Sequence, residues 1–402
     1  MTFKEVQLQD ILDIQWGDTK TTKSSYVSDG YLAYSATGPD GFLEKFDYDR
    51  EGIVLSAIGA NCGSTFFASG KWSCIKNTIR ILPKSGAIDL KYFFYMTKAP
   101  DFWPIRGSAQ PFISQTDIRE LYVQIPEVSV QNVIGKILFE LEQKISTNNA
   151  LSKTLEDIAQ TIFKSWFIDF DPVKAKMAGE KPAGMDAATA ALFPDSMEES
   201  ELGIVPSGWK VTKLSSSLKL HKSTVKAGAS TESVPYVPVD QIGAKDIFLK
   251  NSMPGSAAKT SLVSFRKNDI LFGAMRPYFH KVVLAPFDGT TRTTTFVLRV
   301  INSNYLSHSL FTVNQENAVA FATNNSQGTT IPYAVWNNSF EDFPMVLPPE
   351  PTAKAFNDLV LPIIEYGYSL IAQNRSLVEI RNGLLPRLIS GELQIPDEML
   401  AS

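Results

Sequence analysis

The hydrophobic pattern of the chain is organised around residues 130–165, where apolar side chains recur at every seventh position. One row holds Ile134, Leu141, Asn148, Leu155 and Ile162, and a companion row three residues on includes Ile137, Leu151 and Ile158. Apolar residues at alternating three- and four-residue steps form one continuous stripe along a helix. The pattern predicts a long helix with an apolar stripe that packs against another helix.

A second stretch repeats this pattern 226 residues later. Its rows hold Val360, Gly367, Asn374, Arg381 and Leu388, and Ile363, Leu370, Leu377 and Leu384. Asn148 therefore matches Asn374. An asparagine in a buried row costs stability but fixes register, because its amide needs a partner at the same level. We expect the two stretches to pair within the chain as an antiparallel coiled coil. Since Pro362 must lie in a first turn or kink a helix, the regular second helix is expected to begin near Ile363.

The segments before each long helix are rich in short strands and turns, and they resemble one another. The matching segments are 208–214 with 3–8, 269–274 with 52–57, 328–333 with 107–112, and 346–348 with 124–126. Alternating and β-branched runs bounded by glycine and proline predict strands. The order of a mixed α/β lobe, a strand ending in proline and a long helix thus occurs twice, and it predicts an α+β chain with two α/β lobes in tandem.

These patterns divide the chain into six segments. They are a first lobe (1–128), a central long helix (129–165), a linker (166–205), a second lobe (206–348), a C-terminal long helix (349–392) and a tail (393–402). The linker contains proline, glycine and acidic patches, which are typical of a flexible connection. Its aromatic and methionine residues nevertheless predict that part of it packs.

Charge is distributed unevenly. The net charge of the chain is −4, but residues 206–346 carry 14 basic and 8 acidic side chains, whereas residues 127–205 carry 7 and 13. A basic lobe is compatible with phosphate contacts, although a solvated basic face gives the same count. The N-terminus lacks the pattern of a signal peptide, and no apolar run is long enough to span a membrane. Two cysteines, Cys62 and Cys74, fit a reducing cytoplasm.

A search for catalytic motifs finds none that is convincing. His221, His280 and His308 lack metal-ligand spacing and are expected on the surface or in loops. The stretch from Gly63 to Trp72 has too long a loop for a phosphate cradle, and a tryptophan stands where the hydroxyl is needed. Glu142-Gln143-Lys144 has a nuclease-like spacing but no upstream acidic partner. We therefore expect a non-catalytic binding protein with no metal or cofactor of its own.

Candidate contacts to DNA come from polar loop residues, whose donors and acceptors suit base edges and phosphates. For bases they are Arg106, Ser108 and Gln110 in the first lobe and Arg276, Tyr278, His280, Asn325, Gln327, Thr329 and Thr330 in the second. For phosphates they are Lys222, Lys226, Lys267 and Lys281. The run from Thr290 to Thr295 is interpreted as a plain β-strand rather than as a base-contacting loop.

The chain resembles the specificity subunit of type I restriction-modification enzymes over essentially its whole length. The motifs that carry the resemblance are residues 384–393, residues 158–173, the strand exits Ile125-Pro126 and Leu347-Pro348, and residues 203–209. The resemblance implies two target-recognition domains, each of which reads half of a split, asymmetric DNA site, with the paired helices as a spacer.

The resemblance also implies partners. Two methyltransferase subunits, which supply S-adenosylmethionine and adenine methylation, are expected to bind the helical regions around 137–162 and 363–388. A restriction subunit would add ATP- and magnesium-dependent translocation and cleavage. Two alternatives stay open: a subunit that serves a modification-only methyltransferase, and a coiled-coil scaffold whose lobes bind protein.

Overall fold

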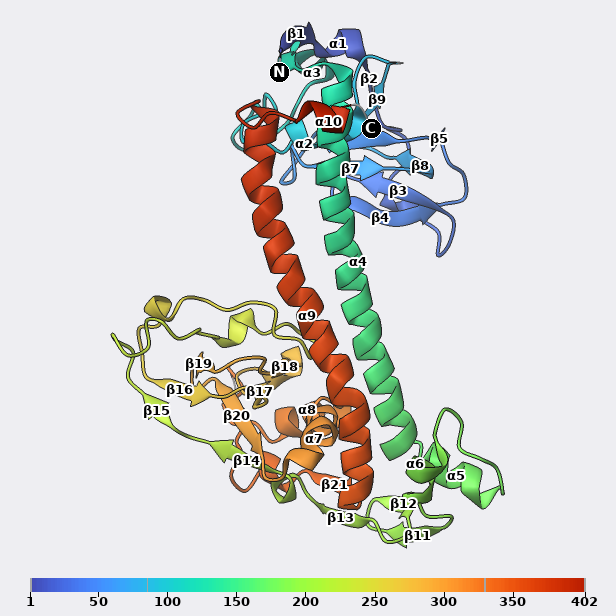
Figure 1. Cartoon of the computed structure of the whole chain (residues 1–402), viewed down its shortest axis with the longest axis vertical. Helices are drawn as coiled ribbons and strands as arrows, with labels where there is room; N and C mark the ends of the chain where they lie inside the picture. The colour runs from blue at the N-terminus through green and yellow to red at the C-terminus, as the bar shows by residue number, and fades with distance from the viewer. Residues whose placement is uncertain (1, 85, 329, 401–402) are drawn as a thin grey trace. The chain divides into compact units, whose positions relative to one another are not determined.

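The computed structural model describes residues 2–84, 86–328 and 330–400. The chain forms two compact units, one made of residues 1–147 and 374–402 and the other of residues 148–373. The first contains a strand-rich lobe 1 (residues 2–126) and the second a strand-rich lobe 2 (residues 206–347). Two long helices, α4 (Val128–Phe167) and α9 (Glu350–Ile389), contribute one half to each unit (Figure 1).

Lobe 1 is built on a four-stranded antiparallel sheet in the order β2-β9-β6-β7. A second sheet, β4-β3-β8-β5, lies beside it, and β1 pairs with β10. The strands are β1 (Lys4–Gln7), β2 (Leu12–Trp16), β3 (Tyr31–Ser35), β4 (Gly38–Leu43), β5 (Tyr48–Asp49), β6 (Gly52–Ser56), β7 (Thr65–Ala68), β8 (Lys71–Cys74), β9 (Thr78–Pro83) and β10 (Tyr122–Ile125), and the helices are α1 (Leu8–Ile11), α2 (Leu90–Met96) and α3 (Gln115–Glu120).

The first half of α4 completes the core of lobe 1. Ile134 and Leu138 are fully buried in the same apolar cluster as the strands β6 and β9. The hydroxyl of Tyr95 on α2 donates to the backbone carbonyl of Leu138 at 3.0 Å. Gln131 has no exposed surface, and its amide donates to Pro126 at 2.8 Å. The start of the helix is therefore fixed to the lobe by both apolar burial and polar contacts.

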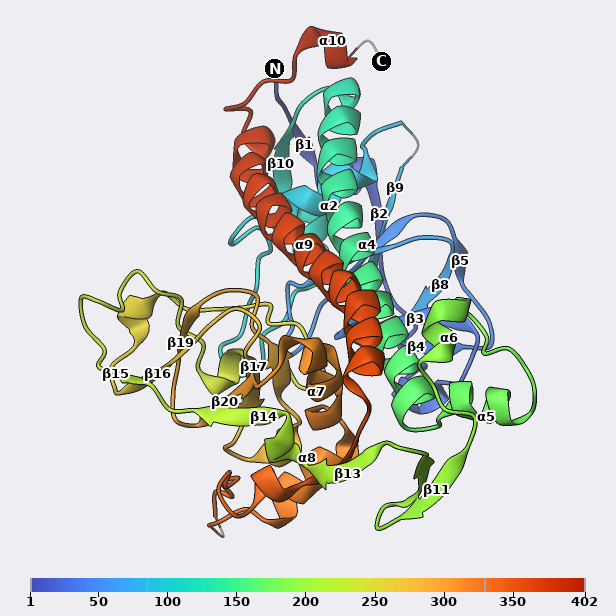
Figure 2. The ribbon, with the colours of Figure 1, turned by 60° about the horizontal axis from the view of Figure 1, so that its bottom comes forward.

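Lobe 2 repeats this architecture. Its main antiparallel sheet has the order β14-β20-β17-β18, which corresponds strand by strand to β2-β9-β6-β7 of lobe 1. Figure 2 shows β14, β17 and β20 of this sheet. The pair β13-β21 corresponds to β1-β10. The strands are β13 (Lys210–Lys213), β14 (Leu218–His221), β15 (Thr224–Val225), β16 (Leu262–Phe265), β17 (Ile270–Gly273), β18 (Val282–Leu284), β19 (Gly289–Thr291), β20 (Thr295–Val300) and β21 (Pro344–Leu347), and the helices are α7 (Leu306–Val313) and α8 (Glu316–Asn324). The predicted tandem repeat is confirmed.

The two long helices run antiparallel in each unit. In the first unit Arg381 Nη1 donates to Glu142 Oε2 at 2.5 Å, and Asn374 Nδ2 donates to the carbonyl of Ile145 at 3.2 Å. In the second unit the rings of Phe163 and Phe356 lie 6.0 Å apart. In the second unit the hydroxyl of Ser152 also donates to the carbonyl of Gly367 at 3.5 Å. Within each unit, a contact that lies later on α4 lies earlier on α9, so the helices are antiparallel, as predicted.

The first predicted row is buried or half-buried along both helices, and so are Ile137 and Leu151 of the companion row on α4, but the prediction is wrong for Ile158. Ile158 exposes 43% of its surface. The buried companions lie four residues after the first row instead of three. They are Leu138, Ile145, Ser152, Ala159 and Trp166. A straight helix turns once in 3.6 residues, and α4 packs against a lobe as well as against α9, so its buried stripe is displaced toward the lobe.

The predicted start of the second helix is also wrong. The helix begins at Glu350 and continues through Pro362, which is exposed. Only one backbone N–H is lost at a proline, and the flanking residues Val360 and Ile364 are buried. Packing of these neighbours outweighs the local penalty.

Residues 166–205 pack rather than hang free. They form α5 (Asp171–Met177), α6 (Ala187–Ala191) and a hairpin of β11 (Met197–Ser200) and β12 (Gly203–Pro206). Phe193 is buried and stands edge-on to Trp166 at 5.1 Å between ring centroids. The aromatic content that predicted packing is thus accounted for.

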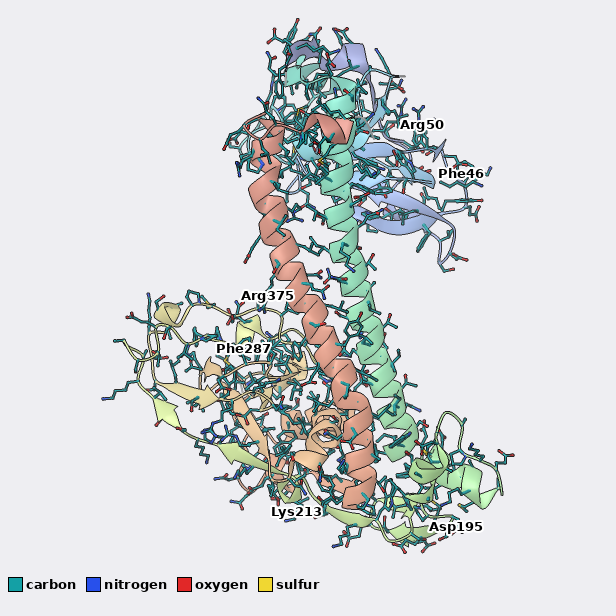
Figure 3. All side chains as sticks on the ribbon, in the orientation of Figure 1. Phe46, Arg50, Asp195, Lys213, Phe287 and Arg375 are labelled. Carbon is teal, nitrogen blue, oxygen red and sulfur yellow. The ribbon has the colours of Figure 1, made fainter. Side chains whose placement is uncertain are left out.

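An ion pair of 2.8 Å joins Lys213, at the end of β13, to Asp342, which precedes β21; Lys213 is labelled in Figure 3. The remaining short elements include the turns η5 (Pro277–Phe279) and η7 (Phe340–Asp342) and the helix α10 (Asp397–Leu400). Among the residues that the structure describes, no helix combines the length and apolar character needed to cross a membrane.

Candidate nucleic-acid interface

A tight hairpin projects the candidate residues of lobe 1. Arg106 and Phe112 exchange two backbone hydrogen bonds of 2.9 and 2.8 Å, which close a loop that carries the exposed side chains of Ser108 and Gln110. Gly107 has φ +79°, and a Cβ placed on it would lie 2.8 Å from the carbonyl oxygen of Gln110. Both the backbone conformation and the close approach therefore require glycine.

Lobe 2 contains the same hairpin. Gln327 and Tyr333 exchange backbone hydrogen bonds of 2.9 and 2.8 Å, and Gly328 has φ +89° with a would-be Cβ 2.9 Å from the carbonyl oxygen of Ile331. Gln327 and Thr330 are exposed on it. The candidate Thr329 lies outside the described residues. The repeated sequence segments thus form equivalent structures.

Each hairpin is attached in the same way to the end of the central strand of its lobe. In lobe 1, Gly59 N–H donates to the carbonyl of Pro111 at 2.9 Å. In lobe 2, Arg276 N–H donates to the carbonyl of Pro332 at 2.8 Å. The donors lie three residues beyond the ends of β6 and β17, so both hairpins are fixed close to the rigid sheet. A rigid support is what recognition loops need to hold side chains in place.

Arg106 combines exposure with orientation. Its Nη2 donates to Asp117 at 2.6 Å, while the side chain keeps 63% of its surface exposed. The ion pair fixes one edge of the guanidinium. The other donors remain accessible for a bidentate contact such as arginine makes with guanine.

The loop Arg276–His280 places its candidates in different environments. Tyr278 is half exposed, but His280 is buried, and its Nε2 lies 2.9 Å from the carbonyl oxygen and 3.1 Å from the side-chain oxygen of Asn314. His280 therefore anchors the loop. Asn325 is exposed at the end of α8, where its amide nitrogen donates to the carbonyl of Phe321 at 2.9 Å.

The four candidate lysines fall into two groups. Lys222 and Lys226 are exposed near β14 and β15. Lys281 Nζ donates to the carbonyl of Val239 at 2.8 Å, and Lys267 Nζ lies 3.6 Å from Glu365 on α9. The first pair is better placed for phosphates than the second.

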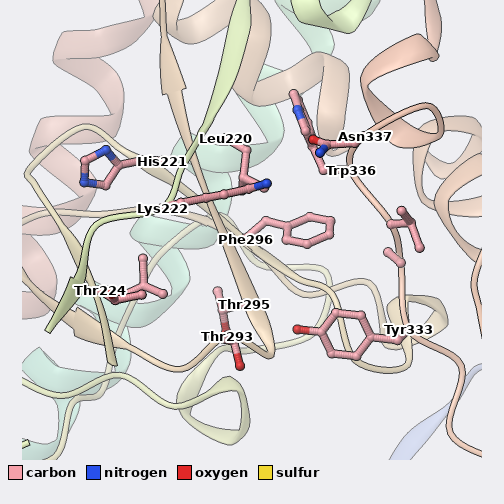
Figure 4. Close-up of a pocket in the computed structure, with 13 residues that line it drawn as sticks. Leu220, His221, Lys222, Thr224, Thr293, Thr295, Phe296, Tyr333, Trp336 and Asn337 are labelled. Atoms are coloured by element: carbon pink, nitrogen blue, oxygen red, sulfur yellow. The ribbon is translucent and has the colours of Figure 1, made fainter. Parts of the chain in front are cut away.

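An apolar hollow of about 400 Å³ adjoins the lobe 2 hairpin (Figure 4). Tyr333, the closing residue of the hairpin, lines it together with Phe296, Trp336 and Lys222. Burial raises the pKa of the Tyr333 phenol, which therefore stays protonated and can donate a hydrogen bond.

The threonine run beside this hollow is not one strand. β19 ends at Thr291 and β20 begins at Thr295, and the chain turns between them. The interpretation as a plain strand is therefore wrong. β19 pairs with β16 in one sheet and β20 with β14 and β17 in another, so the turn carries the chain between two sheets.

The expectation that the histidines lie on the surface or in loops is wrong for His308. It lies in the buried helix α7, and burial lowers its pKa to about 3. His221 lies on β14, where burial and the neighbouring Arg299 lower its pKa. Within the described part of the chain, histidine, cysteine and acidic residues form no group of three or more able to hold a metal.

Two features of this loop were not predicted from the sequence. Phe279, next to Tyr278, exposes 47% of its surface, and Asn314 holds His280 from a different helix region. The Arg-Pro-Tyr-Phe-His order signals a turn, but the partner of its histidine is 34 residues away and depends on the tertiary fold.

Comparisons with known proteins agree with this arrangement. Residues 1–157 match the family model described as the type I restriction modification DNA specificity domain. The chain is 24% identical over 363 residues to the MjaIX specificity subunit of Methanocaldococcus jannaschii, covering 86% of this chain and 79% of that protein. It is 22% identical to the EcoDI specificity subunit of Escherichia coli, covering 97% and 88%. The crystal structure of the type I S subunit from M. genitalium superposes with a TM-score of 0.64 at 13% identity, over 96% of both chains.

The chain has the fold of a type I restriction-modification S subunit. Its N-terminal 157 residues match the specificity domain of that family, and most of the chain is similar to type I specificity subunits.

Proposed function

We propose that this chain reads a bipartite, asymmetric DNA site, with each lobe recognising one half. The observation that carries the proposal is the repeated hairpin, which is closed and attached by equivalent backbone bonds in both lobes but displays different side chains. The two hairpins share one backbone structure, but one displays Arg106 and Gln110 and the other Gln327 and Thr330, which suits two different half-sites. A palindromic site would need the same side chains on both hairpins.

Affinity would come from phosphates and specificity from base edges. Lys222 and Lys226 are exposed cations of the basic lobe 2. The guanidinium of Arg106 suits guanine, and the amides of Gln110 and Gln327 suit adenine. Binding of this kind weakens steeply with salt and is lost when the base sequence is shuffled.

The partners in this proposal are methyltransferase subunits that dock on α4 and α9, and a restriction subunit. Both helices carry exposed apolar side chains that the chain itself does not cover. They include Ile158, Leu359, Tyr366 and Ile380. S-adenosylmethionine, ATP and magnesium belong to those partners in this proposal, and this chain contributes no catalytic residue. The paired helices would act as the spacer between half-sites.

The proposal is tested by mapping methylated adenines in DNA after co-expression of the methyltransferase subunit with and without this chain. A split motif that requires this chain is expected. Replacement of residues 206–346 by the corresponding lobe of another specificity subunit should change one half of the motif and leave the other half intact. A purified complex that methylates no motif, or a motif unaffected by the exchange, would contradict the proposal.

A further inference from the structure

Two adjacent aromatic rings stand exposed on the loop between β17 and β18. Tyr278 exposes 50% and Phe279 47% of its surface, and their ring centroids lie 4.8 Å apart. Single exposed apolar residues are common on protein surfaces. A contiguous aromatic pair at a loop tip marks a contact surface instead.

The backbone beneath the rings is rigid. Phe279 N–H donates to the carbonyl of Arg276 at 3.0 Å, and His280 N–H donates to that of Pro277 at 2.8 Å. The carbonyl of His280 accepts from Lys245 N–H at 2.8 Å, and its imidazole is held by Asn314. The rings are therefore presented by a loop that needs no ordering when it binds, which favours tight association.

The loop is also strained. Arg276 and His280, on either side of the Pro277–Phe279 turn, both adopt left-handed backbone conformations, with φ of +52° and +51°. Non-glycine residues adopt this region rarely, and such strain persists where surrounding contacts enforce it, often at binding sites. The contacts of His280 with Asn314 and Lys245 enforce it here.

The position of the loop points to DNA. The bond from Arg276 N–H to the Pro332 carbonyl joins it to the Gln327–Tyr333 hairpin. On that hairpin Ile331 exposes a further 49% of its apolar surface. In lobe 1 the corresponding loop, residues 59–64, contains no aromatic residue. Lobe 2 also carries the excess of basic charge. This excess complements the phosphates of DNA, whereas an uncharged protein partner would not require it.

We propose that Tyr278 and Phe279 form a wedge that enters the duplex at a base step beside the half-site read by lobe 2, unstacks that step and bends the DNA. This proposal rests on the proposed function. Apolar and aromatic side chains inserted between base pairs kink duplexes in this way, and flexible pyrimidine–purine steps yield most readily. The wedge would thus select for deformability at a position where no base edge is contacted. Lobe 1 would leave its half-site unkinked.

The test uses the full complex with methyltransferase subunits and duplexes that carry the motif found by the methylation map. 2-Aminopurine is placed in turn at each position around the lobe 2 half-site, and a donor and acceptor dye at the duplex ends report bending. The wild-type complex should brighten 2-aminopurine at one step and shorten the end-to-end distance. Tyr278→Ala with Phe279→Ala should abolish both signals and weaken binding about ten-fold, because each stacked base is lost. The methylated motif should keep its contacted bases.

Two further variants separate the wedge from general damage. Tyr122→Ala removes another exposed aromatic ring, on β10 of lobe 1, and should leave every signal unchanged. His280→Gly tolerates the left-handed backbone but lacks the imidazole anchor, so it should reduce bending while both rings remain.

The outcomes distinguish the proposals. Wild-type bending retained in the double variant overturns the wedge. Loss of methyltransferase-subunit binding in the double variant, with DNA bending unchanged once that subunit is in excess, assigns the rings to a protein contact and also overturns it. Failure of the wild-type complex to bind any motif overturns the proposed function itself.

Discussion

Glu156 on α4 accepts a hydrogen bond from the backbone N–H of Ile247 in lobe 2 at 3.0 Å. The carboxyl is 2% exposed, and burial raises its pKa. A helix side chain therefore supplies the acceptor for a buried loop N–H. The hydrogen bond to this acceptor stabilises the folded protein, whereas burial of the carboxylate charge destabilises it.

This balance predicts opposite results for two substitutions. Glu156→Gln keeps an oxygen acceptor without the charge, so stability at pH 8 should equal or exceed that of the wild type. Glu156→Ala leaves the Ile247 N–H unpaired, which should cost about 1–3 kcal/mol. Urea unfolding at pH 8 measures both, and equal losses in the two variants would refute the assignment.

His308 predicts a pH dependence of stability. Its pKa falls from 6.5 to about 3 on folding because the ring is buried in α7. The unfolded state therefore binds a proton that the folded state excludes. The contribution of His308 to the free energy of unfolding is fully present above pH 6.5. It should decline as the pH falls below 6.5, by up to about 1.4 kcal/mol per pH unit.

Unfolding of His308→Gln between pH 7 and 5 should show a shallower decline than the wild type. His221→Gln is the matched control, because His221 is half-buried and its substitution should leave most of the slope. A slope unchanged in His308→Gln would contradict the buried neutral histidine.

The faces of α4 predict a contrast between two isoleucines. Ile134 is fully buried, whereas Ile158 exposes 43% of its surface. Ile134→Ala should destabilise the chain by about 2–4 kcal/mol through lost burial and a cavity. Ile158→Ala should change stability by less than about 0.5 kcal/mol. It should instead weaken capture of the methyltransferase subunit in a pull-down, if that helix face is the docking surface proposed above.

The hairpin of lobe 1 predicts a local effect of Gly107→Ala. A Cβ there meets the Gln110 carbonyl at 2.8 Å in a left-handed backbone, so the hairpin should distort at a cost of about 1–2 kcal/mol. Methylation of the motif should fall at one half-site. Gly70→Ala shares the positive φ but meets no atom within 4 Å, so it controls for backbone strain alone.

Arg106 predicts a change of specificity. Arg106→Ala should relax base preference at one position in the lobe 1 half-site by about 1–3 kcal/mol, because a bidentate contact is lost. Arg50 is another exposed arginine of lobe 1 and serves as the control, because it precedes β6 whereas the hairpin is attached beyond the end of that strand. Selection of bound duplexes from a randomised library measures both. Loss of affinity without loss of preference would make Arg106 a phosphate contact.

The sequence predicted the parts of the fold that repeat. The Gly107 and Gly328 segments were matched from their residues alone, and both form the same hairpin, because a glycine at positive φ and a following proline constrain the backbone locally. The burial predicted for the first seven-residue row was also confirmed. The companion row failed at Ile158, since the side on which a lobe covers α4 is a tertiary property that a two-helix pattern does not contain.

The exposure of the candidate residues could be predicted only in part from the sequence. Histidine is a residue type that can contact bases, but the His280 imidazole is held by Asn314 and anchors its loop instead. His308 lies between two serines, which is typical of a surface, and only the packing of α7 buries it. Exposure of Tyr278 and Phe279 likewise follows from the left-handed residues that flank them.

Both hairpins are closed and attached by main-chain hydrogen bonds, and those bonds are indifferent to most side chains. Substitutions at Ser108, Gln110 or Thr330 should therefore leave the hairpins folded. In the proposed function, main-chain atoms of each loop provide its stability and side-chain atoms provide its recognition. A specificity subunit built in this way can change its recognised sequence one residue at a time and retain its fold at each step.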